Sequence, residues 1–285
     1  HAARRHGGDA QPRDRQRGKR LACQNHAVSN CQIKVRTGQE YAPHILPHRF
    51  KARLDEVVDI THDIREFRFR DVNEARFLPG QYALFELSGV EGTRAYSMSN
   101  TPNPRGEWQF QIRHVPTGKG SAYLFGHLKP GDSIEIDGPY GLAYLRPDSA
   151  RDIVCVAGGS GLAPVVSIVR GAAEAGMLAN RQLYFFYGGR TARDICGEAF
   201  FRELPGYGKH IHYYPVVSLP EEYPDLVWKG EVGYVHELVR RTLAERLKAF
   251  EYYFAGPPPM SQALQEMLLV GYQVPFGQIH FDRFF

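Results

Sequence analysis

Residues 152–164 read DIVCVAGGSGLAP, and this stretch decides the fold. The apolar run Ile153–Ala157 is typical of a buried strand, a glycine turn follows it, and Ala163–Ala175 then has apolar residues at helical spacing. A strand, a tight turn and a helix in this order begin a βαβ unit. The alternation continues to the C-terminus, with strands at Leu183–Tyr187, Ile211–Val217 and Tyr252–Ala255 and helices from about Val235 to Lys248 and from Pro259 to about Val270. We therefore expect a doubly wound α/β domain with a parallel sheet over residues 148–285.

Upstream of this domain the periodicity is that of short strands. Alternating apolar and polar residues recur between turn sequences such as Pro79-Gly80, with strands expected at Phe50–Val58, Ile64–Phe69, Tyr82–Leu87, Trp108–His114 and Ser133–Asp137. Several short strands at this spacing indicate an antiparallel β-barrel, which we place at residues 49–147. Residues 41–48 contain two prolines and are expected to be a linker, and residues 1–40 are expected to be a disordered basic tail followed by a remnant of another domain.

The composition argues against several classes of protein. Of the 285 residues, 43% are hydrophobic and 23% are charged, as in an ordinary globular protein, and four cysteines are too few for a disulfide framework. No apolar stretch is long enough for a membrane span, and the N-terminus has charges where a signal peptide would have its apolar core, so we expect a cytoplasmic protein. Seven basic residues among the first 20 account for the net charge of +4. The rest of the chain is near neutral, so nucleic-acid binding is not expected.

Two short motifs in the predicted barrel have the chemistry of a site for an anion and a flat ring. Arg94 can hold a pyrophosphate with its fork of donors, and Tyr96, on the same face of its strand, offers a ring for stacking. Gly118-Lys119-Gly120-Ser121 precedes an expected helix, Ala122–Leu128, whose first backbone N–H groups can bind an anion. Each motif alone is more typical of an ordinary strand or loop.

Taken together and in order, the motifs resemble those of the ferredoxin–NADP reductase superfamily. Arg94-x-Tyr96-Ser97 and Gly118-x-Gly120-Ser121 are similar to its two flavin-binding motifs, and Gly158–Pro164 and Gly256–Met260 are similar to its two nicotinamide-nucleotide loops. The resemblance covers about residues 49–285. It implies an FAD-binding barrel followed by an NAD(P)-binding domain. The cofactor-binding residues predicted on this basis are Arg94, Tyr96, Ser97, Arg113, Gly118, Gly120, Ser121, Gly159, Ser160, Gly161, Pro164, Gly188, Arg190, Asp194, Gly256, Pro257, Pro258, Met260, Phe284 and Phe285.

The resemblance also implies which residues lie at the reacting atoms. Ser97 is expected to hydrogen-bond the flavin N5, and the C-terminal run with Asp282 and Phe284 is expected beside the isoalloxazine ring. The predicted catalytic residues are therefore Ser97, Asp282 and Phe284. The family usually ends on the aromatic residue, whereas this chain has Phe285 one residue beyond, which leaves open whether Phe284 or Phe285 covers the ring. Ala255 occupies a position where some members have cysteine, so no thiol is available there.

The stretch after the strand Leu183–Tyr187 bears on the choice of nucleotide. An acid near the adenosine ribose accepts its hydroxyls and repels a 2′-phosphate, and Asp194 is such an acid. Thr191–Ile195 resembles the corresponding stretch of NADH-using relatives such as cytochrome b5 reductase. Arg190 and Arg193 argue for NADPH, because arginines can hold the additional phosphate. We expect NADH, and NADPH stays the alternative.

The N-terminal segment departs from the family pattern. Leu21-Ala22-Cys23-Gln24 resembles the last cluster-ligand stretch of a plant-type [2Fe–2S] ferredoxin domain, which precedes the flavin barrel in reductases of bacterial oxygenases. A cluster requires four thiolates, and no cysteine lies upstream of Cys23. Either the ferredoxin domain is truncated or altered upstream, or Cys23 is a chance match. We expect truncation, with Cys23 as a remnant ligand, and we expect that this chain lacks the cluster. The histidine spacings do not indicate a metal site.

The function expected is an FAD-containing reductase that takes electrons from NADH and delivers them to a ferredoxin or a terminal oxygenase, as a monomer without membrane or nucleic-acid partners. One alternative is a stand-alone NAD(P)H–flavin or cytochrome b5-type reductase with no link to an oxygenase. Another is a non-catalytic flavoprotein or a nucleic-acid-binding protein that uses the basic arm.

Overall fold

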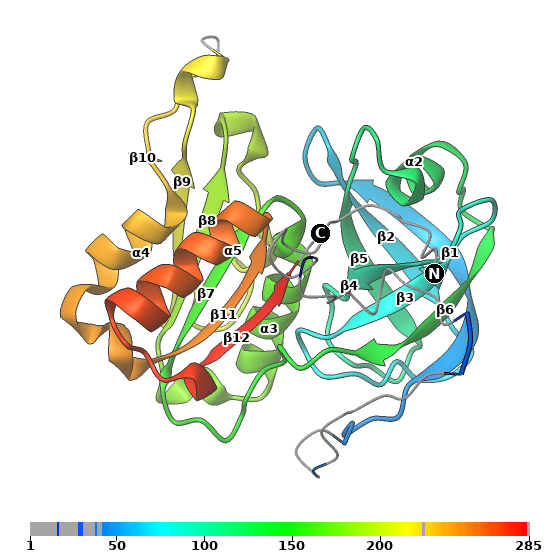
Figure 1. Ribbon diagram of the computed structural model, residues 1–285, viewed down its shortest axis with the longest axis horizontal. Helices are drawn as coiled ribbons and strands as arrows, with labels where there is room; N and C mark the ends of the chain where they lie inside the picture. Colours follow the sequence, from blue (N-terminus) through cyan, green and yellow to red (C-terminus); the bar gives the residue numbers. More distant parts are fainter. Residues whose placement is uncertain (1–15, 17–27, 31–37, 39–41, 224–225, 284–285) are drawn as a thin grey trace. The chain divides into compact units, whose positions relative to one another are not determined.

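The computed structural model describes residues 16, 28–30, 38, 42–223 and 226–283, and residues 45–284 form one compact unit (Figure 1). Three predicted site residues lie outside the described residues: Cys23, the cluster remnant, and the two terminal aromatic residues Phe284 and Phe285. The compact unit contains an antiparallel sheet followed along the chain by a parallel one.

The first half of the unit is the predicted barrel. Its strands are β1 (His48–Asp59), β2 (Ile64–Arg70), β3 (Tyr82–Glu86), β4 (Thr93–Ser97), β5 (Glu107–Arg113) and β6 (Ser133–Tyr140). They form one antiparallel sheet in the order β4-β3-β6-β1-β2-β5. The sheet closes where β4 ends, because Met98 bridges to Phe110 and the Ser99 N–H donates to the Gln109 carbonyl at 2.7 Å. Closure removes the exposed edges that an open sheet would leave.

Alternation along the strands explains which side chains fill the barrel. Phe50, Ala52 and Leu54 on β1 are buried, whereas the residues between them are exposed. Aromatic rings from other strands complete this core, including Phe67, Phe85 and Trp108. The helix expected at Ala122–Leu128 is α2 (Lys119–Gly126), which begins earlier because Gly118 is extended and serves as its N-cap.

The second half of the unit is the predicted doubly wound domain. Its strands are β7 (Asp152–Gly158), β8 (Leu183–Gly189), β9 (Ile211–Val217), β10 (Glu231–Val232), β11 (Phe250–Gly256) and β12 (Ile279–Arg283). All neighbouring strands are parallel, in the order β10-β9-β8-β7-β11-β12. The chain therefore winds outward from β7 to β10 and returns to β11 on the other side of β7. This reversal is a topological switch point, where open α/β sheets bind their ligands.

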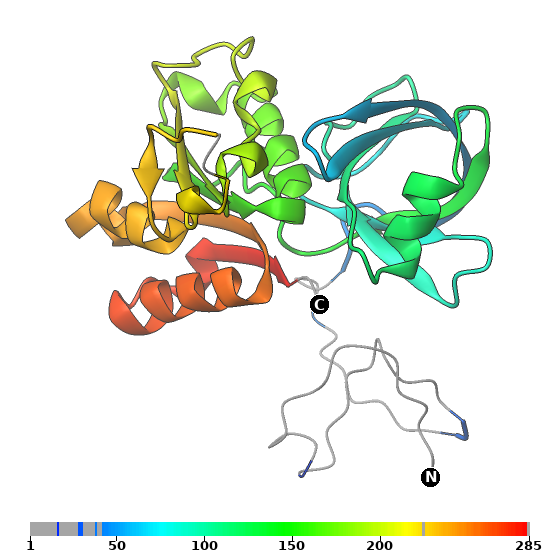
Figure 2. The same cartoon turned by 90° about the horizontal axis from the view of Figure 1, so that it is seen from above.

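Helices cover both faces of this sheet. Helix α3 (Leu162–Glu174) packs on one face, and α4 (Val235–Leu243) and α5 (Pro258–Gln265) pack on the other, as Figure 2 shows in green against orange and red. Two predicted helices end earlier as α-helices: α4 gives way to a 3₁₀ segment at Ala244–Ala249, and α5 continues as a π-helical turn, Glu266–Gly271. No helix in the described ranges is long and apolar enough to cross a membrane.

Candidate active site

A pocket of about 540 Å³ lies at the carboxyl edge of the parallel sheet. Its walls come from the residues that follow β7, β8, β9 and β11, together with the first turn of α4 and part of the barrel. Seven of the predicted cofactor-binding residues line it: Arg113, Gly159, Gly188, Arg190, Asp194, Pro257 and Met260. The switch point and the pocket therefore coincide, as expected for a ligand site of this fold.

Glycines let the backbones at this edge approach one another. A Cβ on Gly161 would stand 1.8 Å from the Ala255 carbonyl oxygen, so this glycine lets the start of α3 pack against the end of β11. Gly256 has a φ of +156° and lies beside Gly158 and the Met260 side chain. Of the predicted loop residues, Gly161 and Gly256 thus have packing roles, whereas Gly159 lines the pocket.

The barrel contributes a cation to the pocket. Arg113, at the end of β5, lies over the glycine loop, with its Nη1 atom 3.0 Å from the position that a Cβ of Gly159 would occupy. Its Nε atom donates to Asp63 Oδ2 at 2.6 Å, and this ion pair orients the guanidinium. A guanidinium beside a glycine loop at a helix N-terminus is suited to a pyrophosphate.

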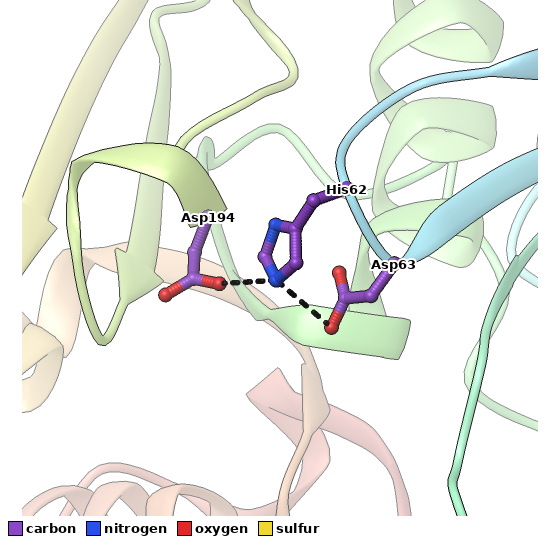
Figure 3. Close-up of side chains that lie close together, drawn as sticks. All are labelled: His62, Asp63 and Asp194. Carbon is purple, nitrogen blue, oxygen red and sulfur yellow. Dashed lines mark ion pairs between the residues drawn. The ribbon is translucent and has the colours of Figure 1, made fainter. Parts of the chain in front are cut away.

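Asp194 lies at the same rim, and its two oxygens have different surroundings. Oδ2 accepts the backbone N–H groups of Arg190 at 3.1 Å and Thr191 at 2.8 Å, and the Thr191 hydroxyl at 3.1 Å. These bonds fix the loop that follows β8. Oδ1 instead faces His62 from the barrel, whose Nε2 atom is 3.7 Å away (Figure 3). One oxygen thus shapes the loop and the other faces the site.

The two arginines that argued for NADPH both have partners within the protein. Arg190 donates to Glu222 at 2.8 Å, and the Arg193 guanidinium lies over the Tyr223 ring at 4.6 Å. Pairing with Glu222 neutralises Arg190 at the pocket wall. Both arginines thus already have a partner within the protein.

The two predicted flavin motifs are brought together in the barrel. A Cβ on Gly120 would stand 2.9 Å from both Arg94 Cγ and the Tyr96 hydroxyl, so the start of α2 lies directly against these side chains. Burial raises the pKa of Tyr96 to about 12, which keeps its hydroxyl protonated. No side chain in the described part of the chain caps α2, so its first N–H groups face outward for an anion. The Ser121 hydroxyl has another role, since it accepts the Val115 N–H at 3.0 Å and closes the preceding loop.

The predicted catalytic residues lie on different elements. Ser97 is buried at the end of β4, and Asp282 lies on β12, where it lines a small cavity with Ala143 and Pro164. The Asp282 Oδ2 atom is buried and has no hydrogen-bond partner among the described residues. Burial raises the pKa of this carboxyl to about 6. Of the other predicted residues, Ser160 is half-buried in the glycine loop and Pro258 is exposed at the start of α5.

Several pocket residues were missed by sequence reasoning. Tyr234 and His236 at the start of α4 stack with ring centroids 5.9 Å apart, and Ser218 and Tyr187 contribute to the walls. A helix start that follows a strand of a parallel sheet belongs to the carboxyl edge, so Gly233-Tyr234 carried the signal that could have identified this wall.

Comparison with known proteins agrees with this geometry. Residues 155–266 match the oxidoreductase NAD-binding domain, and residues 51–144 match the oxidoreductase FAD-binding domain. The chain is 40% identical to the ferredoxin–NAD(P)+ reductase CarAd of Metapseudomonas resinovorans over 275 residues, which cover 96% of this chain and 80% of that protein. This chain belongs to the ferredoxin–NAD(P)+ reductase family. It is thus an oxidoreductase that depends on FAD and NAD(P)H, as the resemblance implied.

Two further relatives support membership of the ferredoxin–NAD(P)+ reductase family. The reductase component of the naphthalene 1,2-dioxygenase/salicylate 5-hydroxylase systems of Ralstonia sp. is 36% identical, over 93% of this chain and 77% of that one. The solved structure of the ferredoxin reductase in carbazole 1,9a-dioxygenase superposes with a TM-score of 0.83 at 37% identity, over 93% of this chain and 78% of that chain. Both are reductase components of oxygenase systems.

The residues present fit FAD. Gly120 lets the start of α2 lie directly against Arg94 and Tyr96, and no side chain caps this helix start in the described part of the chain, so its N–H groups are beside them. A guanidinium fork, a protonated tyrosine and a helix N-terminus are together suited to the pyrophosphate and the flat ring of a flavin nucleotide.

Proposed function

We propose that this reductase oxidises NADH and reduces an iron–sulfur protein, either a ferredoxin or the terminal component of an oxygenase. The observation that supports it most strongly is the pocket at the switch point, where Arg113 and Asp194 stand at one rim. FAD, when bound, accepts a hydride from the nicotinamide and returns the electrons one at a time. The protein supplies binding, orientation and exclusion of water.

The nucleotide is held by groups on both domains. Gly159 and the start of α3 offer backbone N–H groups and the positive end of the helix dipole to the pyrophosphate, and Arg113 adds its guanidinium. Asp194 accepts the adenosine ribose hydroxyls through Oδ1. Pro257 and Met260, which follow β11, line the part of the pocket against which the nicotinamide ring would lie.

FAD would be held by Arg94, Tyr96 and the N-terminus of α2, and Ser97 would donate a hydrogen bond to the flavin. Asp282, with Phe284 and Phe285 beyond it, belongs beside the isoalloxazine ring. The buried, unpaired Oδ2 atom of Asp282 supports this assignment, because such an atom is costly unless a bound group pairs with it.

NADH is preferred to NADPH. The carboxylate of Asp194 lines the pocket, and a 2′-phosphate there would meet a like charge. Arg190 offers little compensation, since it is already paired with Glu222.

Membership of the family suggests which protein accepts the electrons, and relative reduction rates test it. The relatives named above serve oxygenase systems, and we extend that role to this chain. The FAD-loaded protein with NADH should reduce a [2Fe–2S] ferredoxin of an oxygenase system at least about tenfold faster than it reduces cytochrome b5. The reverse order of rates would favour a cytochrome b5-type reductase instead. We keep a monomeric state and a cytoplasmic location as predictions, and the two described cysteines, both free thiols, are compatible with a reducing compartment.

A further inference from the structure

The turn between β1 and β2 of the barrel reaches the nucleotide-binding domain. Ile60 packs against the apolar cluster on the α3 face of the parallel sheet, as Ile195 and Cys196 also do. The turn is held by its own bonds, since the Ile60 N–H donates to the Ile64 carbonyl at 2.9 Å and the Ile64 N–H donates to the Thr61 hydroxyl at 3.0 Å. It is therefore a fixed element that joins the two domains.

His62 projects from this turn between two carboxylates of the pocket rim. Its Nε2 atom is 3.7 Å from Asp63 Oδ2 and 3.7 Å from Asp194 Oδ1, as Figure 3 shows. The exposed fractions of the three side chains are 31%, 18% and 17%, so the ring is only partly open to water. Because the ring is partly buried, a charged imidazole interacts more strongly with the two carboxylates than it would on an open surface.

Both carboxylates are tied to groups that face the nucleotide. Asp63 orients Arg113, which lies over Gly159, and Asp194 fixes the loop after β8 through Oδ2. A cation between them attracts the two walls of the pocket toward each other, one from the barrel and one from the α/β domain. With a neutral ring this attraction is lost, while Asp63 stays paired with Arg113 and Asp194 keeps its bonds to the loop.

We propose that His62 is a positioning residue for the nicotinamide nucleotide: when protonated, it holds the barrel turn and the Asp194 loop together and strengthens binding of the nucleotide. The proposal rests on the proposed function and extends it, because it makes the affinity for the nucleotide depend on pH through one residue outside the predicted binding set.

The charged and titratable groups around His62 come from three elements. Asp63 lies on its own turn, Arg113 on β5, and Asp194 on the loop after β8. Arg190, on the same loop, is paired with Glu222. Cys196 follows the loop, and burial raises the pKa of its thiol to about 11, so it stays neutral below pH values near that figure. Imidazole is the side chain that ordinarily changes charge between about pH 5 and 8.

The sign of the effect follows from linkage. If a charged ring strengthens binding, then affinity is higher when residue 62 carries a positive charge, and binding of the nucleotide to protein with a neutral ring takes up protons. From the strength of partly exposed ion pairs, we expect the Kd of NAD+ to rise about two- to fivefold when that charge is lost.

Isothermal titration calorimetry of the FAD-loaded protein with NAD+, in two buffers of different ionisation enthalpy, measures both the Kd and the number of protons taken up on binding. In the wild type we expect the rise in Kd and a fractional proton uptake near neutral pH. H62Q should bind NAD+ with the weaker, high-pH Kd at every pH and without proton uptake. H62K, which stays charged, should keep the tighter Kd throughout. H127Q is the matched control, since His127 is an exposed residue at the C-terminal end of α2, and it should behave as the wild type does.

Two results would overturn the proposal: proton uptake that persists in H62Q, or a Kd of the wild type that does not change with pH. A protein that binds NAD+ normally but shows either result retains the proposed function and loses only the role of His62. If NAD+ does not bind at any pH and NADH does not reduce the flavin, the proposed function itself fails.

Discussion

Asp194 shows how one side chain can serve both the fold and the site. Its Oδ2 atom closes a capping box with Thr191, and its Oδ1 atom is directed to the pocket rim. The sequence predicted an acid for the ribose at this position, and the structure adds the reason why it is held there. The sequence alone could not have revealed that Arg190 is paired with Glu222, because these residues are 32 positions apart and meet only in the folded chain.

Asp194→Asn should shift the nucleotide preference toward NADPH. The amide keeps one acceptor oxygen, which can still hold the loop after β8, but it removes the negative charge that repels a 2′-phosphate. We expect the ratio of kcat/KM for NADPH to that for NADH to rise about five- to tenfold. Glu222→Gln, which frees Arg190, should raise the same ratio. Steady-state kinetics with both nucleotides measures it, and a ratio unchanged in both variants would refute the account of preference.

Asp282→Asn should change how stability depends on pH. Burial raises the pKa of Asp282 to about 6, so the folded protein holds this proton more tightly than the unfolded chain does. Wild-type stability therefore falls as pH rises from about 4 to 6, because ionisation is easier in the unfolded state. The asparagine variant lacks this loss, so its stability relative to the wild type should rise by about 2 kcal/mol between pH 4 and pH 7.

Denaturant unfolding of both proteins at the two pH values tests this. All other groups titrate equally in the pair, so the difference isolates Asp282. A difference in the free energy of unfolding that stays constant with pH would show that this carboxyl ionises normally in the folded protein.

At the scale of elements, the strand–turn–helix transition at residues 152–164 is held by one close contact. Gly161→Ala would place a Cβ 1.8 Å from the Ala255 carbonyl, so β11 and α3 would have to separate. We expect a loss of about 2 to 4 kcal/mol in the free energy of unfolding, with weaker NADH binding. Gly277→Ala is the control: nothing lies within 4 Å of the added Cβ, and stability should change by less than about 0.5 kcal/mol. Equal effects in the two variants would contradict the packing role of Gly161.

The proposed FAD site is formed by side chains of one strand, β4, and the start of one helix, α2. Arg94→Ala should lower the affinity for FAD about ten- to a hundredfold, because charge-assisted hydrogen bonds to the pyrophosphate are lost. Arg94→Lys keeps the positive charge but loses the forked donor group, so its affinity for FAD should lie between those of the wild type and Arg94→Ala. Fluorescence of released FAD measures the affinity, and circular dichroism checks the fold. Full retention of FAD in the alanine variant would exclude Arg94 as its ligand.

Most elements could be predicted from periodicity, and the exceptions have physical reasons. β12 was missed because Ile279–Arg283 is short and mixed in polarity, and it pairs only with β11 at the sheet edge. The helix after Val235 was predicted too long, because Ala244 has a φ of +41° that ends α4. Neither the edge position nor this backbone turn leaves a periodic pattern in the sequence.

For the whole molecule, the family and the order of the two domains were predictable from four motifs, whereas the contacts between the domains were not. The Ser167 hydroxyl on α3 donates to the Asn100 carbonyl of the barrel at 2.7 Å, and Arg170 donates to the Ser99 carbonyl at 3.0 Å. Together with Ile60 and His62, these contacts place barrel residues at the wall of the nucleotide pocket. A pocket with walls from both domains brings the nucleotide and the flavin domain together.

The central claim is that NADH bound at this pocket reduces FAD held by the barrel, and anaerobic titration of the FAD-loaded protein tests it most directly. About one equivalent of NADH should bleach the visible flavin band, and NADPH should do so more slowly and at higher concentration. A yellow protein with spectrally intact flavin after excess NADH would contradict the account.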